Sequence, residues 1–394
     1  MPLSGTHWPV LLLSVTLREM PTSGIYDFLI VGAGLFGATC AYELSARGQN
    51  CLVIEKRRHI GGNCFTEPRD GITIHRYGPH IFHTSDERIW TWIRQFATFN
   101  HYRHRAKVNL HGKIYSFPLN LATFNELWGI TTPNDAKAHL DSIAIPNIDV
   151  SDLEGWALSK VGSEIYHKFI KGYTSKQWGC DPSCLPASLI KRLPIRLSYD
   201  DSYFVDPYQG IPIGGYTPII EKLFARCRVL TNVDYLRSKS ELDRSARHVI
   251  YTGPLDAFHE FRFGKLDYRS LCFSHELLET NDFQGIAQMN YPSQSIPYTR
   301  IIEHKHFEFG CQPVTWISKE YPASLKDGEG EMYPIPDKDN MERANKYKER
   351  SKDSYFRKYS FGGRLAEYRY YDMHQAIGSA LHLVKMLVSN QSLT

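Results

Sequence analysis

The sequence begins without the features of a membrane anchor or an export signal. Its apolar stretch from Trp8 to Leu17 is too short to span a bilayer, and no basic segment precedes it. We therefore expect neither export nor stable membrane insertion. Because the first predicted strand starts near Tyr26, we interpret residues 1–24 as a disordered and dispensable leader, with Met20 as an alternative start.

The chain also lacks a run of basic residues and any Cys-x-x-Cys pair. Its net charge is only +4 and its Lys and Arg residues are scattered, so we expect no nucleic-acid partner. The eight cysteines are interpreted as reduced thiols of a cytoplasmic protein. Cys180 and Cys184, like the histidine pairs that begin at His80 and His304, lack the further ligands of a metal centre, so we predict no metal.

A glycine-rich turn follows the first apolar run after residues 1–24. In "FLIVGAGLFGATCAYEL", a β-prone segment precedes Gly32, Gly34 and Gly37, and a helical pattern follows them. Gly34 lets the backbone approach a pyrophosphate, and the N-terminus of the helix attracts anions. The spacing therefore predicts a strand, a tight turn and a helix that bind a dinucleotide.

The residues after this unit select among dinucleotides. The apolar run "CLVIEK" ends at Glu55, an acid that suits a ribose hydroxyl pair and disfavours the 2′-phosphate of NADP. The pair Gly61 and Gly62 resembles the second glycine turn of FAD-binding two-dinucleotide-domain flavoproteins. We therefore expect FAD in preference to NAD.

The rest of the chain changes pattern twice. Residues 120–180 carry helical periodicity and predict a helical insertion. Five later runs predict strands of an antiparallel sheet: "RLSYDDSYFV", "YRSLCFSHELL", "GIAQMNY", "YTRIIEHKHF" and "VTWISKEYP". Two segments return to the nucleotide domain, one around "HVIYTGPLDAF" and one ending in a helix that begins near Asp372.

This order predicts an α/β protein in which a Rossmann-like FAD-binding domain carries a helical domain and an antiparallel sheet domain. The expected boundaries are residues 25–100, 213–262 and 355–394 for the FAD-binding domain; 119–190 for the helical domain, with a mobile lid at about 179–195; and 101–118, 195–212 and 263–354 for the sheet domain.

Several longer strings resemble one flavoenzyme family. The strings are "GPHIFHT", "KGYTSKQWG", "LPASLIKRLPIR", "QGIPIGGYT", "YTGPLDAF", "IPYTRIIEHKHF", "KEYP" and "GRLAEYRYYDMHQAI". Together they resemble UDP-galactopyranose mutases of the prokaryotic type, from about Tyr26 to the last helix. The resemblance implies a cleft in which UDP-galactose meets FAD, an unidentified electron donor that reduces the flavin, and a homodimer.

The resemblance also implies the site residues. FAD would be held by Gly32, Gly34, Phe36, Gly37, Glu55, Lys56, Gly61, Gly62, Asn63, His80, Ile81, Arg364, Tyr371, Asp372, Met373, Gln375 and Ala376. The substrate would be held by His104, Phe169, Tyr173, Thr174, Trp178, Arg192, Tyr203, Asn290, Arg300, Tyr333 and Tyr370. The two arginines and His80 are the expected catalytic residues. His104 is a departure, because many members place Asn there, which leaves its contact with substrate open.

The implied reaction is an isomerisation. UDP-galactopyranose and UDP-galactofuranose would interconvert through attack of the reduced FAD N5 on the anomeric carbon, supplying galactofuranose for cell-surface polysaccharide. Two other functions stay open. A flavin amine oxidase-like oxidoreductase shares the glycine turns and the acid but would oxidise its substrate. A non-catalytic nucleotide-sugar-binding or flavin-sensing protein would show no turnover when reduced.

Overall fold

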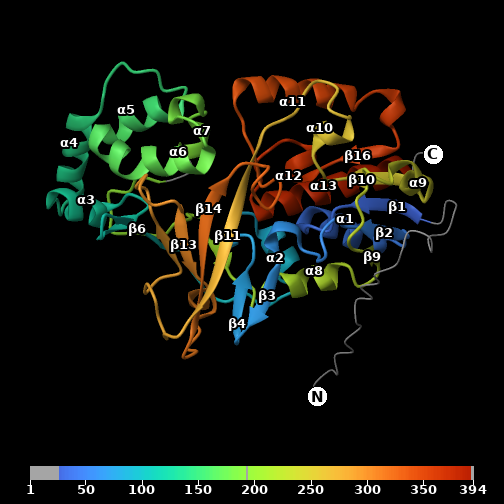
Figure 1. Cartoon of the computed structure of the whole chain (residues 1–394), viewed down its shortest axis with the longest axis horizontal. Helices are drawn as coiled ribbons and strands as arrows, with labels where there is room; N and C mark the ends of the chain where they lie inside the picture. Colours follow the sequence, from blue (N-terminus) through green and yellow to red (C-terminus); the bar gives the residue numbers. More distant parts are fainter. Residues whose placement is uncertain (1–25, 192–193, 392–394) are drawn as a thin grey trace.

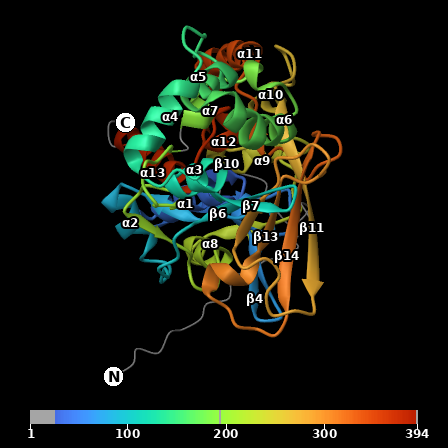
Figure 2. The same ribbon diagram turned by 90° about the vertical axis from the view of Figure 1, so that its left-hand side faces the viewer.

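The computed structural model describes residues 26–191 and 194–391. The predicted leader and Arg192 lie outside this part. Figure 1 shows a sheet and its helices at one end of the molecule, a second group of helices at the other end, and a long twisted sheet between them. The perpendicular view in Figure 2 shows the same long strands running along one side.

A five-stranded parallel sheet organises the nucleotide-binding part. Its strand order is β16 (Tyr359–Phe361), β10 (Ala246–Tyr251), β1 (Tyr26–Val31), β2 (Cys51–Ile54) and β9 (Arg228–Leu230). Successive β1 side chains enter different cores, as the alternation of a strand requires: Phe28 packs on one face and Leu29 on the other. Both faces are therefore buried, which is typical of a parallel sheet covered by helices.

Helices cover this sheet. On the Phe28 face, α1 and α13 pack against each other, and α8 and α2 join the same core. The helices of this part are α1 (Leu35–Ser45), α2 (Glu87–Ile93), α8 (Thr217–Leu223), α9 (Lys239–Arg244), α10 (Leu255–Phe258), α11 (Lys338–Arg350), α12 (Gly363–Ala366) and α13 (Met373–Gln391). The helix predicted near Asp372 is α13, so that expectation is confirmed.

The second sheet has seven strands and crosses the middle of the molecule (Figure 1). Its order is β15 (Tyr333–Pro334), β11 (Tyr268–Leu278), β14 (Thr315–Ala323), β13 (Arg300–Glu303), β12 (Gln288–Asn290), β6 (Ala106–Leu110) and β7 (Lys113–Phe117). The predicted antiparallel sheet is confirmed at every pair but one, because β12 runs parallel to β6. In the chain, β6 and β7 precede the helical group, whereas β12 follows it.

The helical group consists of α3 (Leu121–Trp128), α4 (Pro133–Ile143), α5 (Leu153–Ile165), α6 (Gly172–Trp178) and α7 (Ser188–Lys191). Polar caps start α3 and α5: Asn120 forms a capping box with Thr123, and Asp152 accepts from Gly155 N. A π-helical turn, Tyr166–Lys171, joins α5 to α6 and points Phe169 into the core of this group. The helical expectation for residues 120–180 is confirmed.

Three expectations about strands need correction or completion. The run "RLSYDDSYFV" forms no strand, and "YTRIIEHKHF" is a strand only as far as Glu303, after which a 3₁₀ turn follows. Two small sheets were not predicted: β3 (Thr66–Arg69) with β4 (Ile72–His75), and β5 (Phe82–Thr84) with β8 (Tyr208–Gly210). The domain boundaries themselves stay predictions. In the described part of the chain, no helix has the length and apolarity that crossing a bilayer needs.

Candidate functional site

The first of two neighbouring cavities lies at the carboxyl ends of β1 and β2 and has a volume of about 330 Å³. Part of its wall is formed by the backbone of two glycine turns. Gly32 has φ +106°, and a Cβ added to Gly62 would lie 3.0 Å from the Cα of Gly34. Two glycine turns therefore meet without side chains, which leaves a cradle that a pyrophosphate can approach closely.

Glu55 fixes the geometry of this cradle. Its Oε2 accepts from Ala33 N at 2.8 Å, and its Oε1 accepts from Arg57 N at 2.9 Å. A carboxylate has further acceptor sites beyond these two bonds, and Glu55 lines the cavity. The free acceptor sites of Glu55 thus fit a dinucleotide whose ribose hydroxyls can donate to them.

His80 borders the same cavity as a neutral ring. Its Nδ1 lies 2.9 Å from the Gly78 carbonyl oxygen, which can only accept, so Nδ1 carries the proton and Nε2 presents a lone pair. Burial lowers the pKa of His80 to about 4, against the opposing effect of the Gly78 bond. Near pH 7 this residue is a hydrogen-bond acceptor and not a cation.

The second cavity, of about 140 Å³, lies between the helical group and the long sheet. Helix α6 contributes Tyr173, Thr174 and Trp178, and β13 contributes Arg300. Aromatic rings and a guanidinium that line one cavity suit a ligand with a flat base and an anionic group.

Arg300 is paired with a carboxylate that sequence reasoning missed. Its Nε donates to Glu320 Oε2 at 2.8 Å, across the register of β13 and β14. The Glu320 side chain is only 1% exposed. Burial acts against the charge of Arg300, but the Glu320 carboxylate raises its pKa overall, so the guanidinium stays charged. The sequence carried no signal for this pair, because it depends on the register of β13 against β14 that the fold sets.

Arg364 stands where the two cavities adjoin. It lines the first cavity, and its guanidinium carbon lies 5.4 Å from the ring centre of Tyr333 and 5.1 Å from that of Tyr370, which both line the second. Its nitrogens donate to the carbonyls of Met332 and Tyr371 at 3.1 and 2.6 Å. A ligand in the first cavity and one in the second would therefore approach each other beside these rings.

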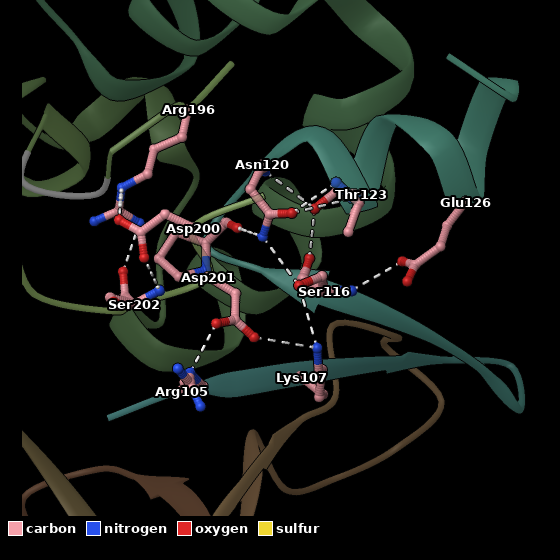
Figure 3. A network of polar contacts seen from close by, with 12 residues as sticks. Arg105, Lys107, Ser116, Asn120, Thr123, Glu126, Arg196, Asp200, Asp201 and Ser202 are labelled. Atoms are coloured by element: carbon pink, nitrogen blue, oxygen red, sulfur yellow. Dashed lines mark hydrogen bonds and ion pairs between the residues drawn. The ribbon is translucent and has the colours of Figure 1, made fainter. Parts of the chain in front are cut away.

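Residues 196–203, which end at the second cavity, are held by the polar network of Figure 3. Asp201 pairs with Arg105 at 2.8 Å and lies 3.6 Å from Lys107 on β6. Tyr203 N then donates to His104 O at 2.8 Å. These bonds replace a strand ladder in the segment predicted as "RLSYDDSYFV", and they place Tyr203 at the cavity.

Comparison with protein families matches residues 168–370 to UDP-galactopyranose mutase and residues 30–96 to an NAD(P)-binding Rossmann-like domain. A probable UDP-galactopyranose mutase of Klebsiella pneumoniae is 38% identical over 92% of this chain and 95% of its own length. The chain belongs to the UDP-galactopyranose mutase family. It is thus a member of an isomerase family. Both the family resemblance of the sequence and the predicted α/β fold class are confirmed.

Other relatives broaden the picture of this mutase family. A dTDP-fucopyranose mutase of Escherichia coli is 37% identical over 92% of this chain and 98% of its own. A crystal structure of reduced UDP-galactopyranose mutase superposes with a TM-score of 0.74, covering 92% of this chain and 94% of that one at 14% identity. Putrescine oxidase with bound putrescine gives a TM-score of 0.54 at 12% identity, covering 92% and 99%. These structural likenesses show the fold alone.

Most of the predicted residues gather at the two cavities. The first is lined by Gly32, Gly34, Phe36, Gly37, Glu55, Lys56, Gly61, Gly62, Asn63, His80, Arg364, Tyr371, Asp372, Met373 and Ala376. The second is lined by Phe169, Tyr173, Thr174, Trp178, Tyr203, Asn290, Arg300, Tyr333 and Tyr370. Ile81 and Gln375 line neither cavity, and Arg192 lies outside the described residues.

His104, the departure from the family pattern, lies beside the second cavity and not on its wall. The residue is 2% exposed, and its ring centre is 5.0 Å from that of Tyr203. Its Nδ1 lies 3.2 Å from the Tyr102 hydroxyl. Burial lowers its pKa to about 3. In this position His104 is a neutral support for Tyr203.

Sequence reasoning missed other lining residues. The first cavity also contacts Val233 and the turn Thr252-Gly253 after β10, and the second also contacts Gln177 and Gln288. The turn lay within the quoted string "YTGPLDAF", at the carboxyl end of a strand, where open α/β sheets bind ligands. Gln177 and Gln288 lie in segments that were predicted as helix and strand, but the direction in which their side chains point depends on tertiary packing.

The prediction of no metal stays a prediction. His83, beside the predicted residues, pairs with Asp206 at 2.6 Å, and donor atoms of His83, Asp372 and His374 lie within 4.8 Å of one another. This group lies next to the first cavity, to which Asp372 belongs.

Proposed function

We propose that this protein interconverts UDP-galactopyranose and UDP-galactofuranose, with FAD in the first cavity and the nucleotide sugar in the second. The supporting observation is the junction at Arg364, Tyr333 and Tyr370. A dinucleotide cradle and a cavity for a base and an anion adjoin there, so one ligand can react with the other.

FAD fits the first cavity because Gly34 and Gly62 leave room for a pyrophosphate and Glu55 offers acceptors to a ribose. Bound and reduced, FAD would supply at N5 the nucleophile for the anomeric carbon. Asp372 and Met373, at the start of the 19-residue helix α13, line this cavity. The N-terminus of that helix favours negative charge nearby and hence an anionic cofactor ring.

The chain's own residues would hold the substrate at both ends. Trp178 and Tyr173 offer ring faces to the uracil, and Arg300 offers a charged donor to the pyrophosphate. Negative charge grows on UDP as the anomeric bond breaks, so a fixed guanidinium stabilises the departing group more than the ground state. Tyr333 and Tyr370 shield the bond-breaking region from water. Arg192 is proposed as the second pyrophosphate ligand, from the sequence alone.

The substrate class can be narrowed by a paired assay. Purified protein is incubated with UDP-galactopyranose or with dTDP-fucopyranose, with and without dithionite, and the products are separated by HPLC. We expect furanose from the uridine substrate only in the reduced samples, with no net oxidation. Preference for the thymidine substrate would move the protein towards the activity of its Escherichia coli relative. Substrate oxidation with oxygen uptake would instead favour the oxidoreductase alternative.

In the cell, the proposed product supplies galactofuranose for cell-surface polysaccharide. An unidentified electron donor would reduce the flavin, and a cytoplasmic homodimer is the proposed working form. Size-exclusion chromatography with light scattering measures the assembly directly.

A further inference from the structure

Lys176 makes an unusual set of contacts behind the second cavity. It belongs to α6, as do Tyr173 and Trp178, but it does not line the cavity. Its Nζ lies 2.6 Å from Tyr291 O, 2.9 Å from Ser293 O, and 3.0 Å from both Ile296 O and Tyr298 O. One ammonium group thus gathers four carbonyls of a single loop, residues 291–298.

These carbonyls form a cation site that the chain fills with its own side chain. Four oxygen dipoles aimed at one point repel one another unless a positive charge lies between them. No carboxylate forms an ion pair with Lys176 in residues 26–191 and 194–391. Burial lowers its pKa to about 8, and the carbonyl oxygens oppose this by favouring the ammonium form. Lys176 is therefore charged near pH 7.

The loop that Lys176 gathers connects two strands of the second cavity. It follows Asn290 at the end of β12 and leads into Arg300 at the start of β13. Asn290, Pro292 and Arg300 all line the cavity. The side chain of Lys176 therefore joins the helix that carries the aromatic wall to the loop that carries the arginine.

Other contacts show that helix and loop are closely fitted. The Thr299 hydroxyl donates to Gln177 Oε1 at 3.3 Å, and a Cβ added to Gly172 would lie 2.3 Å from Pro292 O. Arg269 of β11 also fastens the end of α6, because its Nε donates to Gln177 O at 3.0 Å and its Nη2 donates to Lys176 O at 3.3 Å. Among the ionisable groups next to Lys176, Arg269 contacts its backbone carbonyl, and burial raises the pKa of Tyr291 to about 12, so that hydroxyl is neutral near pH 7.

We propose that Lys176 is a positioning residue that fixes the distance between the base-binding wall and the pyrophosphate-binding Arg300. This inference rests on the proposed function, because it assumes that the second cavity takes a nucleoside diphosphate. Lys176 touches no ligand. It acts by holding residues 291–298 against α6, so a ligand with a base and a pyrophosphate meets both halves of its site in register.

The test compares Lys176→Met, which keeps the length and removes the charge, with Lys168→Met. Lys168 is the matched control because it is a lysine of the preceding π-helical turn and pairs with Glu164 at 2.5 Å on the surface. UDP binding is measured by calorimetry on the flavin-loaded proteins. We expect Kd for UDP to rise about tenfold or more in Lys176→Met, which corresponds to about 1.4 kcal/mol, and to stay unchanged in Lys168→Met.

Two further readouts separate positioning from general damage. Uridine occupies only one half of the site, so Lys176→Met should change its affinity much less than that of UDP. In Lys176→Ala, propylammonium should restore UDP affinity by entering the carbonyl site, whereas propanol should not. Equal losses for uridine and UDP, or no restoration by propylammonium, overturn the inference.

The outcomes also distinguish this inference from the proposed function. If wild-type protein does not bind UDP, the proposed function fails and the inference fails with it. If wild-type protein binds UDP and Lys176→Met binds it equally well, only the inference fails. The absorption spectrum of bound flavin and the melting temperature show whether each variant is folded.

Discussion

Arg300 and Glu320 face each other on neighbouring strands, and Nε of the guanidinium donates to the carboxylate at 2.8 Å. The pair is nearly enclosed, with side chains 18% and 1% exposed. A buried carboxylate cannot be left alone at low cost, so Arg300 has a structural partner as well as a proposed ligand. Any experiment on this arginine must separate the two.

Removing the Arg300 guanidinium should affect activity and stability together. We expect Arg300→Ala to lower kcat/KM by about 30-fold or more, since truncating one partner of a desolvated charge pair costs about 2–5 kcal/mol. FAD should stay bound, because Arg300 does not line the first cavity. The melting temperature should also fall, since Glu320 loses its counter-charge. Steady-state kinetics, flavin absorbance and thermal unfolding measure the three effects.

A double variant isolates the ligand role. In Arg300→Met with Glu320→Gln, neither charge remains buried, so stability should return towards that of the wild type while activity stays low. Activity that recovers with stability would show that Arg300 serves the fold and not the substrate.

Replacing Trp178 should weaken UDP binding specifically. We expect Trp178→Ala to raise Kd for UDP by about 5- to 150-fold, because a base stacked on an aromatic ring is worth about 1–3 kcal/mol in nucleic-acid binders. Trp178→Phe should keep most of the affinity, because a flat ring remains. Calorimetric titration decides the matter, and an unchanged Kd in the alanine variant would make Trp178 a packing residue only.

The prediction that FAD is the cofactor can be tested with two glycine variants, one in the cradle and one as a control. Purified protein should be yellow and should release FAD, not FMN or NAD, on denaturation. Gly62→Ala should lose FAD, because the new Cβ would lie 3.0 Å from Gly34 Cα inside the cradle. Gly48→Ala is the control, since Gly48 also has positive φ, at +79°, but no atom lies within 4 Å of its added Cβ. Chromatography of the released flavin gives the occupancy; equal loss in both variants would mean that backbone strain, not the cradle, is responsible.

Buried histidines should make the protein sensitive to acid. Burial lowers the pKa of His75 and His104 to about 3 and that of His80 to about 4, whereas the unfolded chain titrates near 6.5. Below about pH 6.5 the unfolded state binds protons that the folded state does not. Stability is therefore fully present above this pH and is lost as pH falls towards 4, by about 1.4 kcal/mol per pH unit for each histidine.

Urea unfolding between pH 7.5 and 5 checks this prediction, with pH values chosen to bracket the histidine titration. His104→Asn should reduce the slope of unfolding free energy against pH by about one proton, whatever it does to the stability at neutral pH. A slope that is unchanged in this variant would show that His104 titrates normally in the folded protein.

The sequence by itself determined the local units of the nucleotide-binding part. A β-prone run before Gly32 and an acid at Glu55 gave β1, α1 and β2, because strand alternation, glycine turns and helix periodicity act over a few residues. The longer strings placed the chain in its family. Those strings also contain several of the residues that line the two cavities, including Trp178 and Arg300.

Tertiary structure alone decided which distant segments meet. The segment around Asp201 has strand-like residues but is held by Arg105 and the network of Figure 3, so it pairs with no strand. The parallel pairing of β12 with β6, the Arg300–Glu320 pair and the four carbonyls around Lys176 join residues far apart in the chain. Side-chain type and spacing set local conformation, but the free energy of such contacts depends on the burial and partners that only the folded chain supplies.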